Sequence, residues 1–319
     1  AAEKDPTIMI GGTLPILSAG HRIGGGDTIV LESCEYYNSF LSFSPTVAVI
    51  LNIEADHLDF FKDLEDIKKS FYQFANLVPE NGCVIVNGDD ENALSALQGL
   101  SKPVLTFGLS EKVDVRGANI QISGRHTEFD IFCNGEFFTH VVLQIPGRHN
   151  ILNALAAAAA ARIVGVSGLS VSEGLLAFSG AGRRFEYKGS VNGADVYDDY
   201  AHHPGELHAL LDAVSSLQYK RIVLAFQPHT YSRTRALFHE FVQELSRADV
   251  LFLAEIYAAR EKNTIGISSR DLSDAIPGSV FLPTFEQLEQ KIREIAQPGD
   301  AILTVGAGDI YKVGEHLVK

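Results

Sequence analysis

Residues 47–87 read VAVILNIEADHLDFFKDLEDIKKSFYQFANLVPENGCVIVN, and this stretch decides the fold class. Its two ends, residues 47–51 and 83–87, are short apolar runs rich in β-branched side chains, which is typical of buried strands. Between them, the apolar side chains of residues 64–77 recur at the spacing of one helix face. A strand, a helix and a strand in succession predict a parallel sheet covered by helices.

The same alternation continues on both sides of this stretch. Residues 28–31 and 104–107 are also predicted to be buried strands. Over residues 113–144 strands alternate without helices, which predicts a small antiparallel sheet appended to the parallel one. A helix is predicted over residues 150–164, and its unbroken run of alanines would let it approach its neighbour closely.

A second strand and helix alternation begins beyond a cluster of small residues near position 180. It contains three predicted strands, each followed by helical sequence: residues 221–226, 250–254 and 301–305. We therefore predict an α/β protein of two domains, residues 1–179 and 180–319. The second domain is expected to be Rossmann-like.

Composition limits the functions that this chain can have. Its 26 Lys and Arg face 40 Asp and Glu, a formal charge of −14, which argues against nucleic acid or an anionic membrane as a partner. We find no apolar stretch of membrane-spanning length and no signal peptide. The three cysteines lie far apart: Cys34, Cys83 and Cys133. A reducing cytoplasm is the simplest interpretation.

Two polar loops follow predicted strands in the first domain. One is NIEADHLD (residues 52–59), where Asp56 and Asp59 flank His57, and the other is ESCEYYNSF, which begins at Glu32. If the two strands are neighbours in the sheet, Glu32 and His57 meet at one edge. Carboxylate oxygens with an occasional imidazole suit Mg²⁺. The alternative is that His57 is a surface or capping histidine and that Glu32 and Glu35 merely cap the following segment.

Two segments could bind a nucleotide. In PGRHNILN (residues 146–153), Asn150 opens the alanine-rich helix, either as its N-cap or as part of a site for an anion or a polar ligand edge. In GAGRRFE (residues 180–186), Arg183 and Arg184 offer the forked donors that suit a polyphosphate. A solvated basic pair in a linker is an equal alternative.

The densest polar clusters lie in the second domain. YDDYAHHP (residues 197–204) places two carboxylates, two imidazoles and two phenols directly after a short strand, and folding alone does not require them. QPHTYSRTR (residues 227–235) follows another strand, and His229, Arg233 and Arg235 could clamp a carboxylate or a phosphate.

Two helix starts are predicted after these strands. Ser232 is able to cap the helix that follows QPHTY. GAGD (residues 306–309) is predicted to cap the last helix, as a tight strand-to-helix turn or as a loop that binds a ligand.

Six segments occur in a fixed order along the chain: NIEADHLD, GRHNILNALAA, RRFEYKG, DDYAHHP, QPHTYSRT and LTVGAGDIYKVGE. They resemble the successive motifs of the Mur ligases, most closely those that join L-alanine to UDP-N-acetylmuramate. ESCEYYNSF resembles the form found in some Gram-positive members. Six ordered matches are far more specific than any single one.

The resemblance implies an ATP-dependent ligase of peptidoglycan synthesis, with a central ATP-binding domain followed by a Rossmann-like domain. In such a ligase the muramyl carboxylate attacks the γ-phosphate of ATP, and the amine of alanine then displaces phosphate from the acyl phosphate. ATP and Mg²⁺ are the implied cofactors, and UDP-N-acetylmuramate and L-alanine are the implied substrates.

The resemblance also implies residue roles. Glu32 and His57 would hold Mg²⁺. Six residues are expected at the nucleotide, with the first two near the adenine and ribose: His149, Asn150, Asn153, Arg183, Arg184 and Asp198. Arg183 and Asp199 would face the phosphates from either side of an interdomain cleft. The expected amino-acid contacts are Tyr200, His202, Arg233, His229, Thr230 and Arg235. The residues expected to act in the reaction are His57, Asp199, His202 and Arg233.

Two features depart from the pattern of the family. Many relatives have arginine where this chain has Thr230, so Arg235 would have to supply the second guanidinium contact to the alanine carboxylate. The chain also contains no G-x-x-x-x-G-K-[ST] phosphate loop. It opens at Ala1 without a methionine, so we expect a fragment that lacks this loop and the domain for the UDP-sugar. Without the loop, the fragment is expected to have no ligase activity.

Three other functions remain as alternatives. The first is a sister ligase of the same family, above all one that recycles murein peptides. The second is a non-catalytic module that binds a nucleotide or an amino acid. A dinucleotide oxidoreductase is disfavoured because no G-x-G-x-x-G follows a predicted strand.

Overall fold

The structure, a computed structural model, describes residues 1–58, 60–123 and 126–319. The chain divides into two compact units, Ala1–Ser179 (unit 1) and Gly180–Lys319 (unit 2). Both are α/β units, as the sequence predicts.

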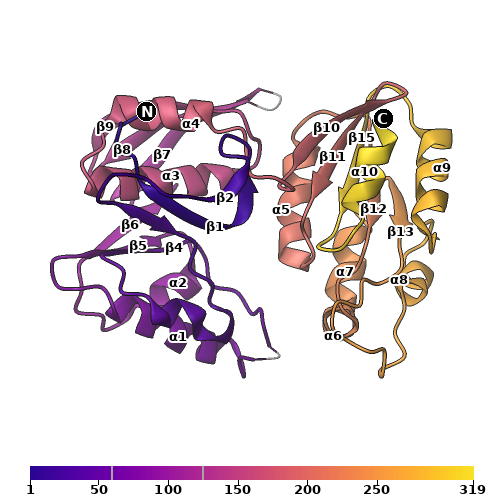
Figure 1. The fold of residues 1–319 in the computed structure, drawn as a ribbon, viewed down its shortest axis with the longest axis horizontal. Coiled ribbons are helices and arrows are strands. Elements are labelled where there is room, and N and C mark those ends of the chain that lie inside the picture. The colour runs from indigo at the N-terminus through magenta and orange to yellow at the C-terminus, as the bar shows by residue number, and fades with distance from the viewer. Residues whose placement is uncertain (59, 124–125) are drawn as a thin grey trace. The chain divides into compact units, whose positions relative to one another are not determined.

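Unit 1 contains a six-stranded mixed sheet and a separate three-stranded sheet (Figure 1). Its strands are β1 (Thr7–Leu14), β2 (Ala19–Arg22), β3 (Ile29–Leu31), β4 (Val47–Ile50), β5 (Cys83–Asn87), β6 (Val104–Gly108), β7 (Val115–Ser123), β8 (His126–Cys133) and β9 (Glu136–Leu143). Its helices are η1 (Tyr36–Ser42, 3₁₀), α1 (Leu64–Asn76), α2 (Glu91–Ala96), α3 (Arg148–Ile163) and α4 (Gly168–Ala177).

The large sheet of unit 1 has the strand order β4-β5-β6-β7-β8-β9. Strands β4 to β7 pair in parallel and β7 to β9 pair antiparallel. The antiparallel strands predicted after residue 113 are therefore present, and they continue the parallel sheet because β6 pairs with β7.

Helices cover both faces of this sheet. Helices α1 and α2 pack with apolar side chains of β4 and β5 on one face, and α3 and α4 pack on the other. The predicted close approach of the alanine-rich helix is confirmed, because Ala156, Ala158 and Ala159 of α3 are buried in the core. The acidic N-terminus of α1 is capped by Asp63, whose side chain accepts from the amide N–H of Asp66 at 2.9 Å.

The three-stranded sheet, in the order β2-β1-β3, differs from the prediction. Strand β3 was expected to be buried, but Ile29, Val30 and Leu31 are 64%, 50% and 38% exposed. The reason is that β3 pairs only along one side, with β1, and forms an edge of this small sheet.

Unit 2 is a three-layer α/β/α structure. Its strands are β10 (Glu186–Val191), β11 (Ala194–Asp199), β12 (Arg221–Phe226), β13 (Val250–Leu253), β14 (Val280–Phe281) and β15 (Asp300–Val305). Its helices are α5 (Pro204–Ser215), α6 (Tyr231–Ala236), α7 (Phe238–Leu245), α8 (Ser269–Ala275), α9 (Phe285–Ile295) and α10 (Tyr311–Leu317).

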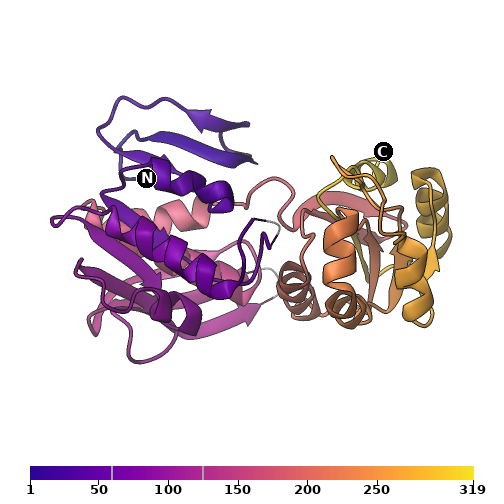
Figure 2. The ribbon, with the colours of Figure 1, turned by 90° about the horizontal axis from the view of Figure 1, so that it is seen from below.

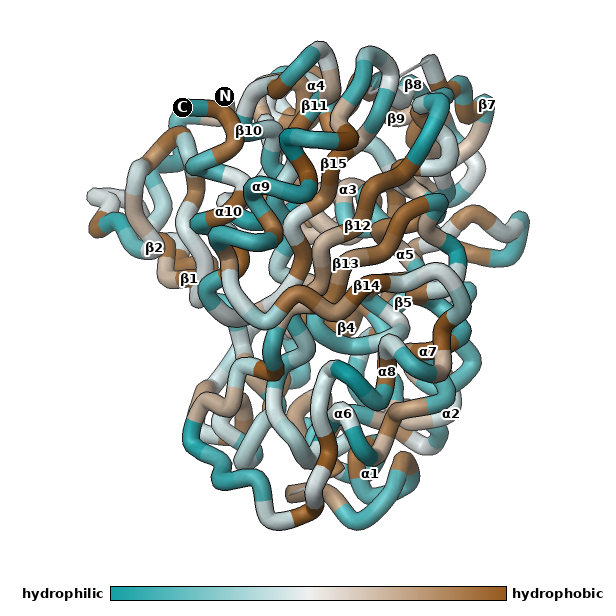
Figure 3. The backbone as a smooth tube through the Cα atoms, turned by 90° about the vertical axis from the view of Figure 1, so that its right-hand side faces the viewer, coloured by the Kyte–Doolittle hydropathy of each residue, from teal (hydrophilic) through white to brown (hydrophobic). Residues whose placement is uncertain are grey.

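The sheet of unit 2 has the order β10-β11-β15-β12-β13-β14, and all neighbours are parallel except β10 and β11. Helices α5, α7 and α8 cover one face, and α9 and α10 cover the other (Figure 2). Because both faces are covered, the central strands are apolar on both sides, and Figure 3 shows β12 and β13 as hydrophobic runs.

Candidate functional site

The parallel strands of unit 2 end in one row. Asp199 at the end of β11 lies beside Val305 of β15, and Val305 also lies beside Phe226 of β12. Phe226 in turn pairs with Leu253 at the end of β13. The segments that follow these four residues therefore leave the sheet at the same edge, and open α/β sheets bind ligands at this edge.

A buried ion pair stands at this edge. The Nε of Arg183 donates to Asp198 Oδ2 at 2.9 Å, and Arg183 Nη2 donates to the carbonyl of Gly306 at 2.6 Å. The guanidinium carbon lies 5.0 Å from the ring centre of Tyr200 and 4.7 Å from that of Tyr311. Burial raises the pKa of Asp198, and the neighbouring Arg183 opposes that rise. The ion pair ties the loop before β10 to the ends of β11 and β15.

Asp199 is buried, and both of its oxygens accept backbone N–H groups. The donors are the amides of Ala201 at 2.8 Å and Phe185 at 2.7 Å. Burial raises the pKa of Asp199 to about 6, and these two bonds and the charge of exposed Arg184 oppose the rise. Asp199 and Arg183 belong to the same unit, so the expectation that they face the phosphates from either side of a cleft is wrong. The carboxylate fixes the turn that carries the next polar residues.

Two imidazoles meet beyond this turn. The ring centres of His202 and His229 are 5.5 Å apart at an interplanar angle of 67°. His229 also stacks on Tyr257 at 5.7 Å, and its Nδ1 lies 3.1 Å from Arg233 Nη1. Burial, with the nearby His202 and Arg233, lowers the pKa of His229 to about 4. The segments after β11, β12 and β13 thus bring four side chains together: His202, His229, Arg233 and Tyr257.

Helix α6 begins differently from the prediction. Its N-cap is Thr230, whose Oγ1 accepts from the amide of Arg233 at 3.4 Å, so Ser232 is not the cap. Ser232 instead bonds through its amide and its hydroxyl to the carboxylate of Glu261. Arg235 is exposed. Thr230 has a positive φ of 68°.

The GAGD loop needs its glycines for close packing. A Cβ on Gly306 would lie 2.5 Å from the carbonyl oxygen of Gln227, and one on Gly308 would lie 2.7 Å from the ring of Tyr257. The loop does not cap the last helix as predicted, because the N-cap of α10 is Ile310. These glycines bring the loops after β12, β13 and β15 together.

A second polar cluster lies in unit 1. The Nε2 of His57 is 3.1 Å from Glu35 Oε1 and 3.8 Å from Asp56 Oδ2, and its ring stacks on Tyr36 at 4.4 Å. The hydrogen bond from His57 lowers the pKa of Glu35, and burial of the carboxyl group partly opposes this effect. Asp59, which the sequence placed beside His57, lies outside the described residues.

Glu32 does not share a sheet edge with His57. Strand β3 pairs with β1, whereas β4 pairs with β5 in the other sheet, so the predicted neighbouring strands are not neighbours. The carboxylate of Glu32 accepts from the amide of Gly11 at 2.5 Å. Among residues 1–58, 60–123 and 126–319, no group of three or more His, Cys, Asp or Glu side chains is arranged to hold a metal ion.

The expected nucleotide residues of unit 1 lie in the first turns of α3. The N-cap of this helix is Gly147, so Asn150 is not the cap. The side-chain amide of Asn150 donates to the carbonyl of Pro146 at 2.6 Å and closes the first turn. His149 and Asn153 are exposed on the same turns.

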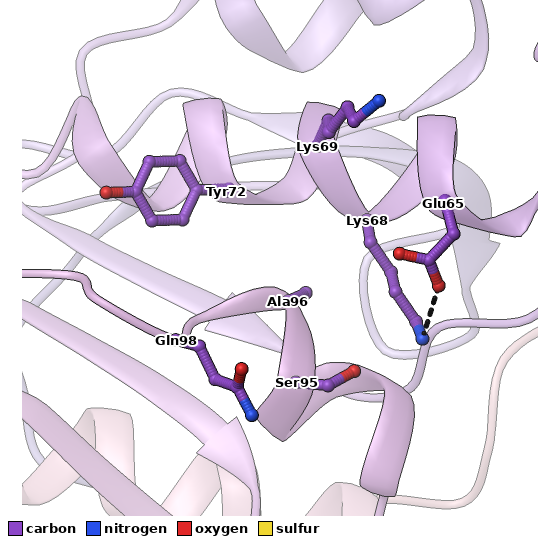
Figure 4. A pocket seen from close by; sticks show the side chains of 7 residues that line it. All are labelled: Glu65, Lys68, Lys69, Tyr72, Ser95, Ala96 and Gln98. Atoms are coloured by element: carbon purple, nitrogen blue, oxygen red, sulfur yellow. Dashed lines mark hydrogen bonds and ion pairs between the residues drawn. The ribbon is translucent and has the colours of Figure 1, made fainter.

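A shallow hollow of about 390 Å³ lies elsewhere on unit 1, between α1 and α2 (Figure 4). Lys68 is turned toward Glu65 in it, with Nζ 2.9 Å from Oε1. The lining residues are Glu65, Lys68, Lys69, Tyr72, Ser95, Ala96 and Gln98. None of the predicted site residues lines it.

Comparisons with known proteins agree with the motifs. The Mur ligase middle domain matches residues 14–161, and the Mur ligase, glutamate ligase domain, matches residues 183–308. A UDP-N-acetylmuramate–L-alanine ligase of Caldanaerobacter subterraneus is 43% identical over all of this chain and 70% of its own length. That of Clostridium novyi is 46% identical with the same coverage. The chain belongs to the Mur ligase family.

The fold of this Mur ligase also matches a solved relative. The crystal structure of the UDP-N-acetylmuramate–alanine ligase from Thermotoga maritima superimposes with a TM-score of 0.81 at 26% identity. The match covers 99% of this chain and 68% of the other. The predicted resemblance and fold class are thereby confirmed. In the part of the chain that the structure describes, no helix combines the length and apolar character needed to span a bilayer.

Sequence reasoning missed some residues of the two clusters. Tyr257 and Glu261 follow β13 at the same sheet edge, so the rule that ligands bind beyond strand ends could have found them. Glu35 was considered only as a cap. Its contact with His57 joins two loops of this Mur ligase that are far apart in the sequence, so no local sequence pattern predicts it.

Proposed function

We propose that this Mur ligase joins L-alanine to UDP-N-acetylmuramate, with ATP hydrolysed to drive the reaction. The relatives at 43% and 46% identity carry that name over the full length of this chain. The observation that carries the proposal is the group of His202, His229 and Arg233 at one sheet edge. An imidazole pair beside a guanidinium suits an amino acid, which brings one carboxylate and one ammonium.

The chemistry divides into two transfers. The muramyl carboxylate would attack the γ-phosphorus of ATP, and the P–O bond to ADP would break. The amine of alanine would then attack the acyl carbon, so that a C–N bond forms as the C–O bond to phosphate breaks. Positioning and charge neutralisation supply most of the catalysis in such transfers.

Arg233 is the guanidinium best placed for the alanine carboxylate. One contact of its guanidinium, at 3.1 Å, is with Nδ1 of His229, whose lowered pKa keeps that ring neutral. Thr230 caps α6 and Arg235 is exposed, so the second contact would come from the His229 ring instead of another arginine. Arg183 already pairs with Asp198, and it would contribute to nucleotide binding mainly by holding the loop.

The donors in unit 1 fit Mg²⁺ and the nucleotide. Mg²⁺ is usually held by one or two protein groups together with water and substrate phosphates, so Glu35 and His57 would hold it without a cluster of three protein ligands. Bound Mg²⁺ would neutralise phosphate charge. His149 and Asn150 lie in the first turn of α3, where backbone N–H groups favour anions and polar ligand edges.

The test is phosphate release by the protein expressed from its complete reading frame. We expect release that requires UDP-N-acetylmuramate, Mg-ATP and L-alanine together. Turnover with a murein tripeptide in place of alanine would indicate the recycling ligase, and binding without turnover would indicate a non-catalytic module. Either result would overturn the proposal. The 319 residues alone, which contain no G-x-x-x-x-G-K-[ST] segment, are expected to release no phosphate.

A further inference from the structure

The two facing histidines hold their protons on opposite ring nitrogens. Arg233 Nη1 lies 3.1 Å from Nδ1 of His229. A guanidinium can only donate, so this Nδ1 must accept, and the proton of a neutral His229 is on Nε2. Burial, helped by His202 and Arg233, lowers the pKa of His229 to about 4, which keeps the ring neutral. His229 therefore presents an N–H donor.

His202 has the other tautomer. Its Nδ1 lies 3.0 Å from the backbone carbonyl of Tyr200, and a carbonyl can only accept. The Nδ1 of His202 must therefore carry a proton, and the lone pair of the neutral ring is on Nε2. At Nε2, therefore, His229 is a hydrogen-bond donor and His202 is an acceptor.

The carboxylate of Glu206 lies on the Nδ1 side of His202. Glu206 Oε2 lies 3.4 Å from His202 Nδ1 and accepts from the amides of His202 at 2.8 Å and His203 at 3.1 Å. The capping box at the start of α5 thus fixes this carboxylate. A carboxylate on the Nδ1 side of an imidazole orients the ring and stabilises its protonated form. The rings of Tyr200 and His229 also face His202.

We propose that Nε2 of His202 accepts a proton from the ammonium of the incoming amino acid, with Glu206 as a positioning residue. His229 Nε2–H and Arg233 would hold the carboxylate of the same amino acid. This inference rests on the proposed ligase function and adds the proton path to it.

The proton balance is complete. The ammonium loses one proton to His202 and becomes an amine, whose lone pair forms the C–N bond. The nitrogen then loses a second proton to the departing phosphate as the C–O bond breaks. The imidazolium of His202 returns its proton to solvent after the product leaves.

The tautomers can be measured on the 319-residue chain itself. Long-range ¹H–¹⁵N spectra of ¹⁵N-histidine-labelled protein report which ring nitrogen carries the proton. Spectra of His202→Gln and His229→Gln assign the two rings. Above neutral pH we expect His202 protonated at Nδ1 and His229 at Nε2. A proton on Nε2 of His202 would overturn the proposal.

The proton transfer can be tested by comparing two nucleophiles in the protein expressed from its complete reading frame. Hydroxylamine is largely uncharged near neutral pH and traps acyl phosphates as hydroxamates without a general base, whereas alanine must first lose a proton. In His202→Gln we expect the ratio of alanine to hydroxylamine turnover to fall about 100-fold. His208→Gln, at an exposed position of helix α5, is the control and should keep the wild-type ratio. An unchanged ratio in His202→Gln would refute the proposal.

Glu206→Gln separates positioning from folding. Glutamine can keep the capping box but removes the charge behind His202. The acidic limb of the pH profile for alanine should move to lower pH, because the imidazolium loses its stabilising carboxylate. An unmoved limb would limit Glu206 to a structural role. If the wild-type protein forms neither amide nor hydroxamate, the proposed function fails, and the tautomer measurement still tests the histidines.

Discussion

Replacing Asp199 by asparagine should change how the stability of unit 2 depends on pH. Burial raises the pKa of Asp199 from 3.8 to about 6. The folded protein therefore binds this proton more tightly than the unfolded chain. Between these two values the folded state carries more protons, so the free energy of unfolding falls as pH rises.

The size of this effect follows from the shift. About two pKa units at 1.36 kcal/mol each amount to about 3 kcal/mol, as an order of magnitude. The wild-type protein loses this stability between about pH 4 and pH 6, and Asp199→Asn does not titrate there. One of the two backbone N–H groups would lose its partner in the variant, which costs about 1–3 kcal/mol at every pH. The pH-dependent part of the stability difference can therefore be separated from this constant cost.

Urea denaturation at several pH values measures the difference. Tyrosine fluorescence reports mostly on unit 2, because the chain has ten tyrosines and no tryptophan, and most of the tyrosines lie beyond residue 180. The variant should gain about 3 kcal/mol relative to wild type as the pH rises from about 4 to 6.5. Asp274→Asn on α8, an exposed carboxylate, is the control with parallel curves. Curves for Asp199→Asn that stay parallel to wild type would refute this account of the buried carboxylate.

Three further predictions follow from the ion pairs. Arg183→Met removes the partner of buried Asp198 and should cost about 3 kcal/mol at neutral pH, because an unpaired carboxylate remains inside; adding Asp198→Asn should restore part of it, and no recovery would contradict the reasoning. Asp300→Ala leaves the guanidinium of Arg221, at the start of β12, without its bidentate partner. The free energy of unfolding should fall by about 3 kcal/mol, which lowers the melting temperature. An unchanged melting temperature would argue against this reasoning. Glu35→Gln should raise the Mg²⁺ concentration for half-maximal phosphate release about tenfold, whereas Glu65→Gln on α1 should not, and equal effects would remove Glu35 from the metal site.

Local patterns predicted most secondary elements well. The strands at residues 83–87 and 221–226 occur with the predicted bounds, because an apolar run between turn residues is a local property of the chain. The helix starts were less predictable. Thr230 caps α6 with a φ of 68°, which is rare for a β-branched residue, so its residue type does not predict this position.

The site was predictable where it depends on strand ends in one continuous parallel sheet. Asp199, Phe226 and Val305 align because β11, β15 and β12 pair in register. In unit 1 the same rule failed for Glu32, because β3 is in a different sheet from β4. Which strand lies next to which is a long-range choice, so spacing alone could not place Glu35 instead of Glu32 beside His57.

The amino-acid sequence by itself determined the α/β class, the order of the motifs and the family to which they belong. These depend on periodicity and residue type, both of which are read along the chain. The tertiary structure alone decided which side chains touch, which ring nitrogen of His202 and His229 bears a proton, and why Asp199 holds its proton so tightly. Those properties depend on through-space distances and on exclusion of water, and the chain acquires both only when distant strands come together.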